Sequence, residues 1–216
     1  MKMKNINIKW SLILAFSALI VLQACKKEND YPSKVVTVSF PVITLKGNAI
    51  LVLNRGDVFV DPGATWKDSV TGESGTITSG ANIPTTSDTI VVINYTAANK
   101  YGLRSSITRT VAVTGIPNSL DISGIYIRTA NGDTANISKI DRGVFFTDNI
   151  GGNSTGDVGF FMIKTDSSIL VPSQILKTAG LANFAQESIN YGPPITINYQ
   201  ILASGYGTSV RSFVKQ

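Results

Sequence analysis

The sequence contains no histidine and only one cysteine, Cys25, among its 216 residues. Without histidine the chain cannot build a Ser-His-Asp triad, a Cys-His pair or a zinc site of the usual histidine type. A single cysteine forms no internal disulfide. Charged residues make up only 15% of the chain, and Ser, Thr, Gly and Asn take their place. These absences leave a pair of carboxylates as the remaining route to catalysis.

The apolar stretch at the start of the chain is too short to span a membrane. It runs from Trp10 to Leu22, whereas a transmembrane helix needs about 20 residues. Three lysines precede it, and Ala24 and Cys25 follow it. A basic start, an apolar segment and small residues before a cleavage site are typical of a secretory signal peptide. The sequence therefore predicts a signal peptide over residues 1–24.

Cys25 closes the segment Leu22-Gln23-Ala24-Cys25, which resembles the lipobox of bacterial lipoproteins except that Gln23 stands where a small residue is common. Acylation of the thiol explains both the isolation and the position of Cys25, and several acyl chains on one cysteine give a stable anchor. Residues 25–34 are predicted to be the acylated cysteine and a flexible tether. Within them Lys27-Glu28-Asn29-Asp30 resembles the surface-export signal of Bacteroidota lipoproteins. We therefore expect a lipid anchor in the outer membrane that faces the cell exterior.

The basic character of the chain belongs largely to its signal. The net charge is +5 and the isoelectric point is near 9.3, but the three lysines of the n-region leave with the signal peptide. The mature chain is close to neutral and lacks the basic surface that nucleic-acid binding requires. We expect no nucleic-acid partner, no cofactor and no metal.

The first half of the mature chain has the pattern of a β-sandwich. Its candidate strands are short β-branched runs: Val35–Phe40, Ala49–Leu53, Ile90–Tyr95 and Ser106–Thr114. Turn residues separate them, and no stretch has a sustained helical period. Gly115–Ser119 combines Gly, Pro, Asn and Ser and is predicted to divide a domain over 35–115 from a second domain over 120–216.

The second half is predicted to be an antiparallel β domain. Its candidate strands are Gly124–Arg128, Asn136–Ile140, Val144–Thr147, Val158–Ile163, Ser168–Val171, Ile195–Leu202 and Ser209–Val214. Strands that are neighbours in sequence are expected to pair as a meander, and the sequence leaves open whether the sheet becomes a sandwich or a barrel. Gln174–Phe184 has the weakest β pattern and is predicted to be a loop with a helical turn.

Several spaced motifs in residues 40–115 carry a family resemblance. They are Gly56-Asp57-Val58-Phe59-Val60-Asp61-Pro62-Gly63-Ala64-Thr65, Asn94-Tyr95-Thr96-Ala97-Ala98-Asn99-Lys100-Tyr101-Gly102 and Arg109-Thr110-Val111-Ala112-Val113. This part of the chain resembles the bacterial Ig-like domain of insecticidal crystal toxins and Bacteroidota surface lipoproteins (DUF5011). The resemblance implies an all-β protein in which an Ig-like β-sandwich is followed by the second antiparallel β domain.

The residues of these motifs are predicted to build the fold rather than a catalytic site. Asp57 suits a turn in which its carboxylate accepts backbone N–H groups. Asp61-Pro62-Gly63 suits a tight turn. Tyr95 is expected to bury its ring and hydrogen-bond its hydroxyl. Asp57 and Asp61 alone are too few ligands for calcium.

The second half resembles the C-terminal β module of small Bacteroidota lipoproteins encoded beside glycan-import systems (DUF5012). The residues that carry this looser resemblance are Leu120-Asp121-Ile122-Ser123-Gly124-Ile125-Tyr126-Ile127-Arg128, Val171-Pro172-Ser173-Gln174 and Arg211-Ser212-Phe213-Val214-Lys215. It implies an accessory surface protein that works with an outer-membrane importer and its lid lipoprotein on a polysaccharide.

We therefore predict a non-catalytic surface lipoprotein that binds a glycan. Sugar sites use aromatic side chains with polar neighbours, and the candidates here are Trp66, Phe184, Tyr191 and Tyr206. Each of these aromatic residues alternatively belongs to a core. Adjacent strand residues face opposite sides, so one residue of each Phe-Phe pair, 145–146 and 160–161, is expected to be exposed. The alternative function is a structural or adhesive spacer without glycan binding.

Overall fold

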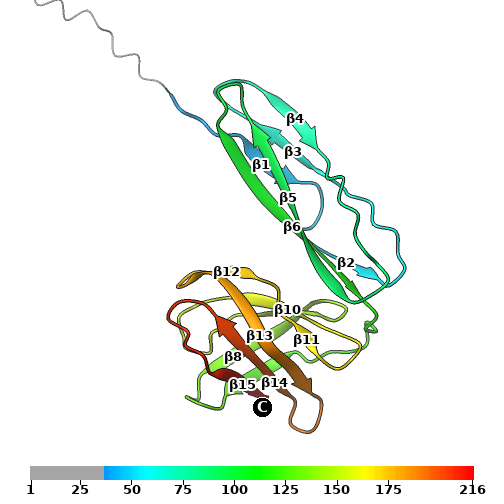
Figure 1. The fold of residues 1–216 in the computed structure, drawn as a ribbon, viewed down its shortest axis with the longest axis vertical. Coiled ribbons are helices and arrows are strands. Elements are labelled where there is room, and N and C mark those ends of the chain that lie inside the picture. Colours follow the sequence, from blue (N-terminus) through cyan, green and yellow to red (C-terminus); the bar gives the residue numbers. More distant parts are fainter. Residues whose placement is uncertain (1–36) are drawn as a thin grey trace, which may run out of the picture. The chain divides into compact units, whose positions relative to one another are not determined.

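The computed structural model describes residues 37–216. The predicted signal peptide over 1–24, the predicted acylation of Cys25 and the predicted tether up to residue 34 lie outside the described residues. The described part of the chain folds into fifteen β-strands without a helix, and Figure 1 shows their arrangement. In residues 37–216 there is consequently no helix with the length and apolarity to cross a membrane. The prediction of an all-β fold is confirmed.

Six strands between residues 42 and 114 form a β-sandwich. They are β1 (Val42–Leu45), β2 (Ile50–Asn54), β3 (Ala64–Lys67), β4 (Ser74–Ile77), β5 (Thr89–Ala98) and β6 (Arg104–Thr114). They make two three-stranded sheets with the orders β1-β3-β4 and β2-β6-β5. The consecutive strands β1 and β2 therefore belong to different sheets, and β2 pairs in parallel with β6.

Side chains from both sheets fill the core of this sandwich. Tyr95, Val111 and Val113 are fully buried, and partly buried residues of β1, β2 and β4 pack against them. Strand β6 is buried on both faces near its end, because Ala112 points away from this core into a separate apolar cluster with Val144 and Met162. Apolar side chains on both faces of β6 are thus buried, and this burial stabilises the strand.

Nine strands between residues 124 and 215 form a second, antiparallel sheet. They are β7 (Gly124–Arg128), β8 (Thr134–Asp141), β9 (Val144–Thr147), β10 (Gly159–Ile163), β11 (Ile169–Leu170), β12 (Gln174–Leu176), β13 (Gly180–Asn190), β14 (Thr196–Leu202) and β15 (Val210–Lys215). The order is β11-β10-β9-β8-β7-β15-β14-β13-β12. Neighbours in sequence pair as predicted, in two meanders, and the pairing of β7 with β15 joins them.

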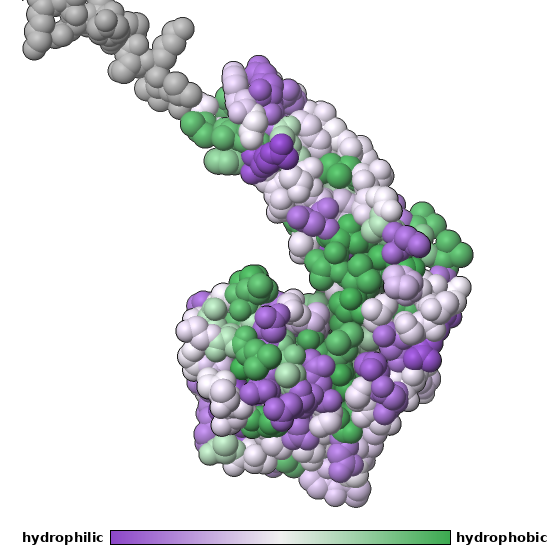
Figure 2. Space-filling model, in the orientation of Figure 1, coloured by the Kyte–Doolittle hydropathy of each residue, from purple (hydrophilic) through white to green (hydrophobic). Residues whose placement is uncertain are grey.

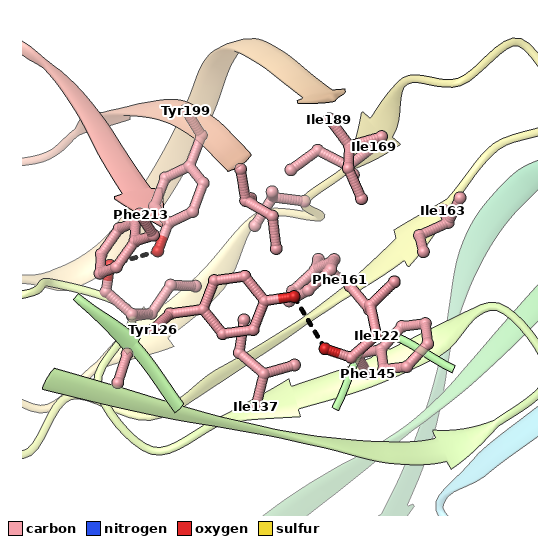
Figure 3. Packing of buried hydrophobic residues seen from close by; sticks show 14 of the residues in the cluster. Ile122, Tyr126, Ile137, Phe145, Phe161, Ile163, Ile169, Ile189, Tyr199 and Phe213 are labelled. Atoms are coloured by element: carbon pink, nitrogen blue, oxygen red, sulfur yellow. Dashed lines mark hydrogen bonds between the residues drawn. The ribbon is translucent and has the colours of Figure 1, made fainter. Parts of the chain in front are cut away.

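The nine-stranded sheet curls around one large core. Figure 3 shows side chains from both meanders pointing toward one another, among them Phe145, Phe161 and Phe213. The rings of Phe145 and Phe161 stack with centroids 5.8 Å apart, while Phe146 and Phe160 are only partly buried on the opposite face. The two residues of each pair face opposite sides, but the expected exposure is not found, because Phe160 packs against the apolar cluster of Ala112, Val144 and Met162.

Two side chains join the free edges of this curled sheet. The amide of Gln174, at the start of β12, accepts from the backbone N–H of Phe160 and donates to its carbonyl, both at 3.1 Å. The carboxylate of Glu187, on β13, accepts from the backbone N–H of Val171 at 3.1 Å. Gln174 therefore replaces, for one residue of β10, the backbone partner that a closed barrel would supply.

The predicted strand over Val35–Phe40 is wrong for the residues that the structure describes. Residues 37–40 form no strand, and the ladder with β3 begins only at Val42. Pro41 has no N–H to donate to a ladder. Instead, the hydroxyl of Ser39 donates to the carboxylate of Asp68, and the carbonyl of Ser39 accepts from the amide of Asn99.

The prediction of a loop with a helical turn over Gln174–Phe184 is also wrong. This segment contains β12 and the first half of β13. A β-bulge lies between Ala185 and Ser188, and Gln186 there has a φ of 54°. The bulge reverses which side chains face the core, so Phe184 and Ile189 both pack inward. The regular alternation that signals a strand is therefore interrupted.

Asp88, just before β5, connects the loops at the end of β6 and after β10. Its carboxylate accepts from the backbone N–H groups of Gly115 (2.8 Å) and Thr165 (2.6 Å) and pairs with Arg55 (2.7 Å). Burial raises the pKa of Asp88, but these hydrogen bonds outweigh it and the pKa lies below the usual value. Asp88 thus connects the sandwich to the loop after β10.

Candidate functional site

Arg109 lies at the centre of a buried polar network inside the sandwich. Its Nη1 donates to Oδ1 of Asp61 (3.0 Å) and to the hydroxyl of Tyr95 (3.1 Å). Its other nitrogens donate to backbone carbonyls in the turns before β2 and before β3. The hydroxyl of Tyr95 also donates to Asp61. The predicted burial and hydrogen bonding of Tyr95 are confirmed.

The carboxylate of Asp61 accepts four hydrogen bonds from within the sandwich. Burial raises the pKa of Asp61, but hydrogen bonds from Tyr95 and from the backbone of Ser79 and Gly63, with the charge of Arg109, lower it below the usual value. Burial and the bond to Asp61 raise the pKa of Tyr95 to about 12. This network holds the predicted turn at Asp61-Pro62-Gly63 and serves the fold.

A second buried network contains Tyr206, one of the predicted ligand-binding residues. Its hydroxyl donates to the carboxylate of Asp157, which also accepts from Thr155 and Thr178. The guanidinium of Arg211 lies 4.8 Å from the centroid of the Tyr206 ring. Tyr206 is buried, so its ring offers no platform on the surface of the described chain.

The other three predicted aromatic residues do not gather with Tyr206. Phe184 faces the core of the nine-stranded sheet and meets Tyr199 edge to face at 6.0 Å. Trp66 lies on β3, and its indole nitrogen occupies the space over Gly75 on β4. Tyr191 follows β13 and exposes 39% of its surface. Their role in ligand binding stays a prediction, for which Tyr191 is the best placed.

A groove beside Trp66 is open to solvent. It has a volume of about 410 Å³ and lies over the outer face of β1 and β3. The side chains on that face are Val42, Thr44, Thr65 and Lys67. The indole of Trp66 belongs to the opposite face of β3, on the side of Ala64 in the core. Trp66 and Ser69 complete the lining of the groove, which combines hydroxyl groups with apolar surface.

The outer face of β13, β14 and β15 carries several uncharged polar side chains, together with Val210 and Val214 of β15. Cross-strand pairing places Ser188, Asn198 and Ser212 in one row and Asn190 beside Thr196. Together with Gln186 in the bulge we call these residues the polar face. All of them are exposed or partly exposed, and Tyr191 follows Asn190 directly. This set was not recognised in the sequence, because the bulge hides the alternation of β13.

Hydrogen bonds within the polar face hold some of its amides in fixed positions. The amide of Asn198 donates to the hydroxyl of Ser188 at 3.3 Å. Gln200, buried beside them, accepts from Gln186 at 3.1 Å and donates to the carbonyl of Thr208 at 2.6 Å. The outward positions of these three strands carry no charged residue. Amide and hydroxyl groups both donate and accept, which suits a neutral ligand rich in hydroxyl groups.

Residues 37–216 hold no group of three or more acidic or cysteine side chains that could bind a metal. The carboxylates of Asp61, Asp68 and Asp157 are each used by several hydrogen bonds within the fold. Burial raises the pKa of Glu187.

Comparisons with known proteins find a similarity in the first half of the chain. Residues 43–113 match the family described as bacterial surface protein, Ig-like domain. The lipoprotein BT2262 from Bacteroides thetaiotaomicron, known from a crystal structure, matches with 24% sequence identity and a TM-score of 0.39, over 82% of this chain and 100% of that chain. A search of curated proteins gives no match. Residues 43–113 are thus similar to the Ig-like domain of bacterial surface proteins.

Proposed function

We propose that this chain is a non-catalytic, lipid-anchored bacterial surface protein that binds a neutral glycan on the polar face. The similarity of residues 43–113 to a surface Ig-like domain and the lipobox at Cys25 support the location. The more specific assignments, DUF5011 and DUF5012 and an exterior-facing outer-membrane anchor, belong to this proposal. So does an accessory role beside a polysaccharide importer and its lid lipoprotein.

The polar face is the observation that carries the glycan proposal. A neutral polysaccharide offers hydroxyl groups that both donate and accept, and the amides of Asn190 and Asn198 match them in kind. Tyr191 adds an exposed ring beside them, against which a sugar ring can pack. The absence of charge on the outward positions of β13–β15 favours a neutral ligand over an acidic one.

The test is affinity electrophoresis and calorimetry with a panel of neutral and acidic polysaccharides, using residues 25–216. The strands and cores that the structure describes in residues 37–216 all lie in this part of the chain, so it retains that fold. The variants Tyr191→Ala and Asn198→Ala are expected to weaken binding about tenfold or more each, the size seen when an interface anchor is truncated. Their melting temperatures should stay close to that of the wild type.

Tyr101→Ala is the matched control, because Tyr101 is an exposed tyrosine of the sandwich and not of the nine-stranded sheet. It should leave glycan affinity unchanged. If the protein binds none of the polysaccharides, the proposal is wrong and a spacer or adhesive role is favoured. Binding that Tyr101→Ala weakens, while Tyr191→Ala and Asn198→Ala do not, would place the site elsewhere. Turnover of any glycan would contradict the non-catalytic assignment.

A further inference from the structure

One end of the sandwich is organised around the buried carboxylate of Asp68. Oδ1 of Asp68 accepts from the hydroxyl of Ser39 (2.6 Å) and the backbone N–H of Val70 (2.9 Å), and Oδ2 accepts from the amide of Asn99 (2.8 Å). Asn99 also donates to the carbonyl of Ser39 and accepts from the backbone N–H of Tyr101. Three segments distant in sequence therefore meet at this end.

Each of these segments exposes a large apolar side chain. The exposed fractions are 55% for Phe40, 69% for Val42, 48% for Val70 and 69% for Tyr101. We call these four residues the apolar end. Figure 2 shows hydrophobic atoms at this part of the molecule, where the described chain begins. Single exposed apolar residues are common on protein surfaces. Here, however, four exposed apolar side chains lie on segments that the buried carboxylate of Asp68 holds together.

Cationic side chains lie beside the apolar end. Lys67 is the cross-strand partner of Val42. The ammonium of Lys100 lies 5.3 Å from the centroid of the Tyr101 ring. Both lysines are exposed, whereas Asp68 is buried and fully hydrogen-bonded. The one other acid here, Glu73, accepts the backbone N–H of Lys100. Exposed tyrosine, phenylalanine and valine beside lysine are the side chains that favour the surface of a lipid bilayer.

We infer that the apolar end rests on the surface of the membrane, with Phe40 and Tyr101 in the headgroup region and Lys67 and Lys100 at the phosphates. The inference rests on the proposed lipid anchor. Ser39 lies fourteen residues after Cys25, and a fully extended chain of that length spans at most about 50 Å. The anchor thus keeps this end of the sandwich near the bilayer, so even a low intrinsic affinity for lipid is effective.

The experiment measures binding to lipid without the acyl chains. Residues 25–216 with Cys25→Ser are sedimented with protein-free vesicles of phosphatidylcholine and phosphatidylglycerol. The protein is expected to partition to the vesicles, more strongly as phosphatidylglycerol increases and less strongly at high salt. The double variant Phe40→Ser/Tyr101→Ser should lower the partition coefficient at least tenfold.

The matched control is Ile175→Ser/Leu181→Ser, which removes two exposed apolar residues that face each other on β12 and β13. It should bind vesicles like the wild type, and circular dichroism should show that all variants are folded. No partition of the wild type, or equal losses in the two double variants, would overturn the inference. Binding to native outer-membrane vesicles but not to protein-free ones would indicate a protein partner instead and would also overturn it.

The outcome is separable from that of the proposed function. Incorporation of labelled palmitate at Cys25 in cells tests the lipid anchor, and the polysaccharide panel tests the polar face. Neither assay depends on Phe40. Tyr101→Ala leaves glycan binding unchanged if the polar face is the glycan site, and Tyr191→Ala leaves vesicle binding unchanged if the apolar end is the membrane site.

Discussion

The guanidinium of Arg109 and the carboxylate of Asp61 form an ion pair of 3.0 Å in the interior of the sandwich. Arg109 is completely buried, and its partner is nearly so. Removing one member of such a pair leaves an uncompensated charge inside the protein. Because the pair also joins the turns before β2 and before β3, it determines how the two sheets meet.

We expect Arg109→Met to lower the free energy of unfolding by about 3–5 kcal/mol, the cost of breaking a buried ion pair. Urea denaturation followed by circular dichroism measures it. The control is Asp166→Asn, which removes the exposed pair between Lys164 and Asp166 and should leave the urea midpoint unchanged. An Arg109→Met protein as stable as the control would show that the network is not needed for the fold.

Gly63 and Gly47 form a matched pair for testing close packing. Their φ angles are 76° and 78°, so alanine is strained equally at both, by about 1 kcal/mol. At Gly63 a Cβ would lie 2.6 Å from the carbonyl oxygen of Ile77, whereas at Gly47 it meets open space. The decrease in melting temperature should therefore be much larger for Gly63→Ala than for Gly47→Ala. Equal shifts would mean that β4 moves freely away from this turn.

The stability of the chain should be flat between pH 6 and 8 and fall in acid. The sequence has no histidine, and the pKa values of Asp61, Asp68, Asp88 and Asp157 are lowered by hydrogen bonds in the native state. The pKa of an aspartate in the unfolded chain is near 3.9. When the native pKa is lower, the ionised carboxylate stabilises the folded protein at every pH above that unfolded value. That contribution is lost as the pH falls through the native values.

Glu187 weakly opposes the loss of stability in acid. Burial raises its pKa, so the contribution of Glu187 to the free energy of unfolding is lost as the pH rises. Urea unfolding from pH 2 to 8 measures the balance. Asp157→Asn should reduce stability at pH 7 and make the acid limb shallower. A fall in stability from pH 8 to pH 6 would contradict the expectation.

Asp88→Ala should weaken the coupling between the sandwich and the nine-stranded sheet. The substitution leaves Arg55 and the backbone N–H groups of Gly115 and Thr165 without their acceptor, and we expect a loss of about 2–3 kcal/mol. Calorimetry should show one transition for the wild type and two, or one broadened, for the variant. Asp141→Ala is the control, since Asp141 is exposed and accepts only from the neighbouring Arg142.

Strand prediction from the sequence succeeded for short runs of β-branched and aromatic residues. Gly124–Arg128 and Val144–Thr147 were predicted with the bounds that the structure has. β3 and β4 were not predicted, because in Ser74–Ile77 only one residue, Ile77, is a large apolar one. β13 was missed because its bulge at Gln186 changes the inward parity. A search for residues that alternate between inside and outside finds a regular strand. It fails for a strand with a β-bulge, because the extra residue shifts the alternation.

The candidate site was less accessible to prediction than the fold. Aromatic residues were the guide to a sugar site, yet Tyr206 and Phe184 are used by the core. Nothing in the one-dimensional pattern distinguishes them from the exposed Tyr191. Ser188, Asn198 and Ser212 lie on three different strands, so only the register reveals that they form one face.

The parallel pairing of β2 with β6 has a mechanical consequence. Five residues of β2, from Ile50 to Asn54, pair with Thr110 to Thr114. Tension between the N-terminal side of the chain and the second sheet pulls β2 from its first residue and β6 from its last, in opposite directions along one axis. The five pairs then bear the load together in shear instead of opening one by one. Single-molecule pulling should require a higher force between these ends than across the β5–β6 turn, which unzips.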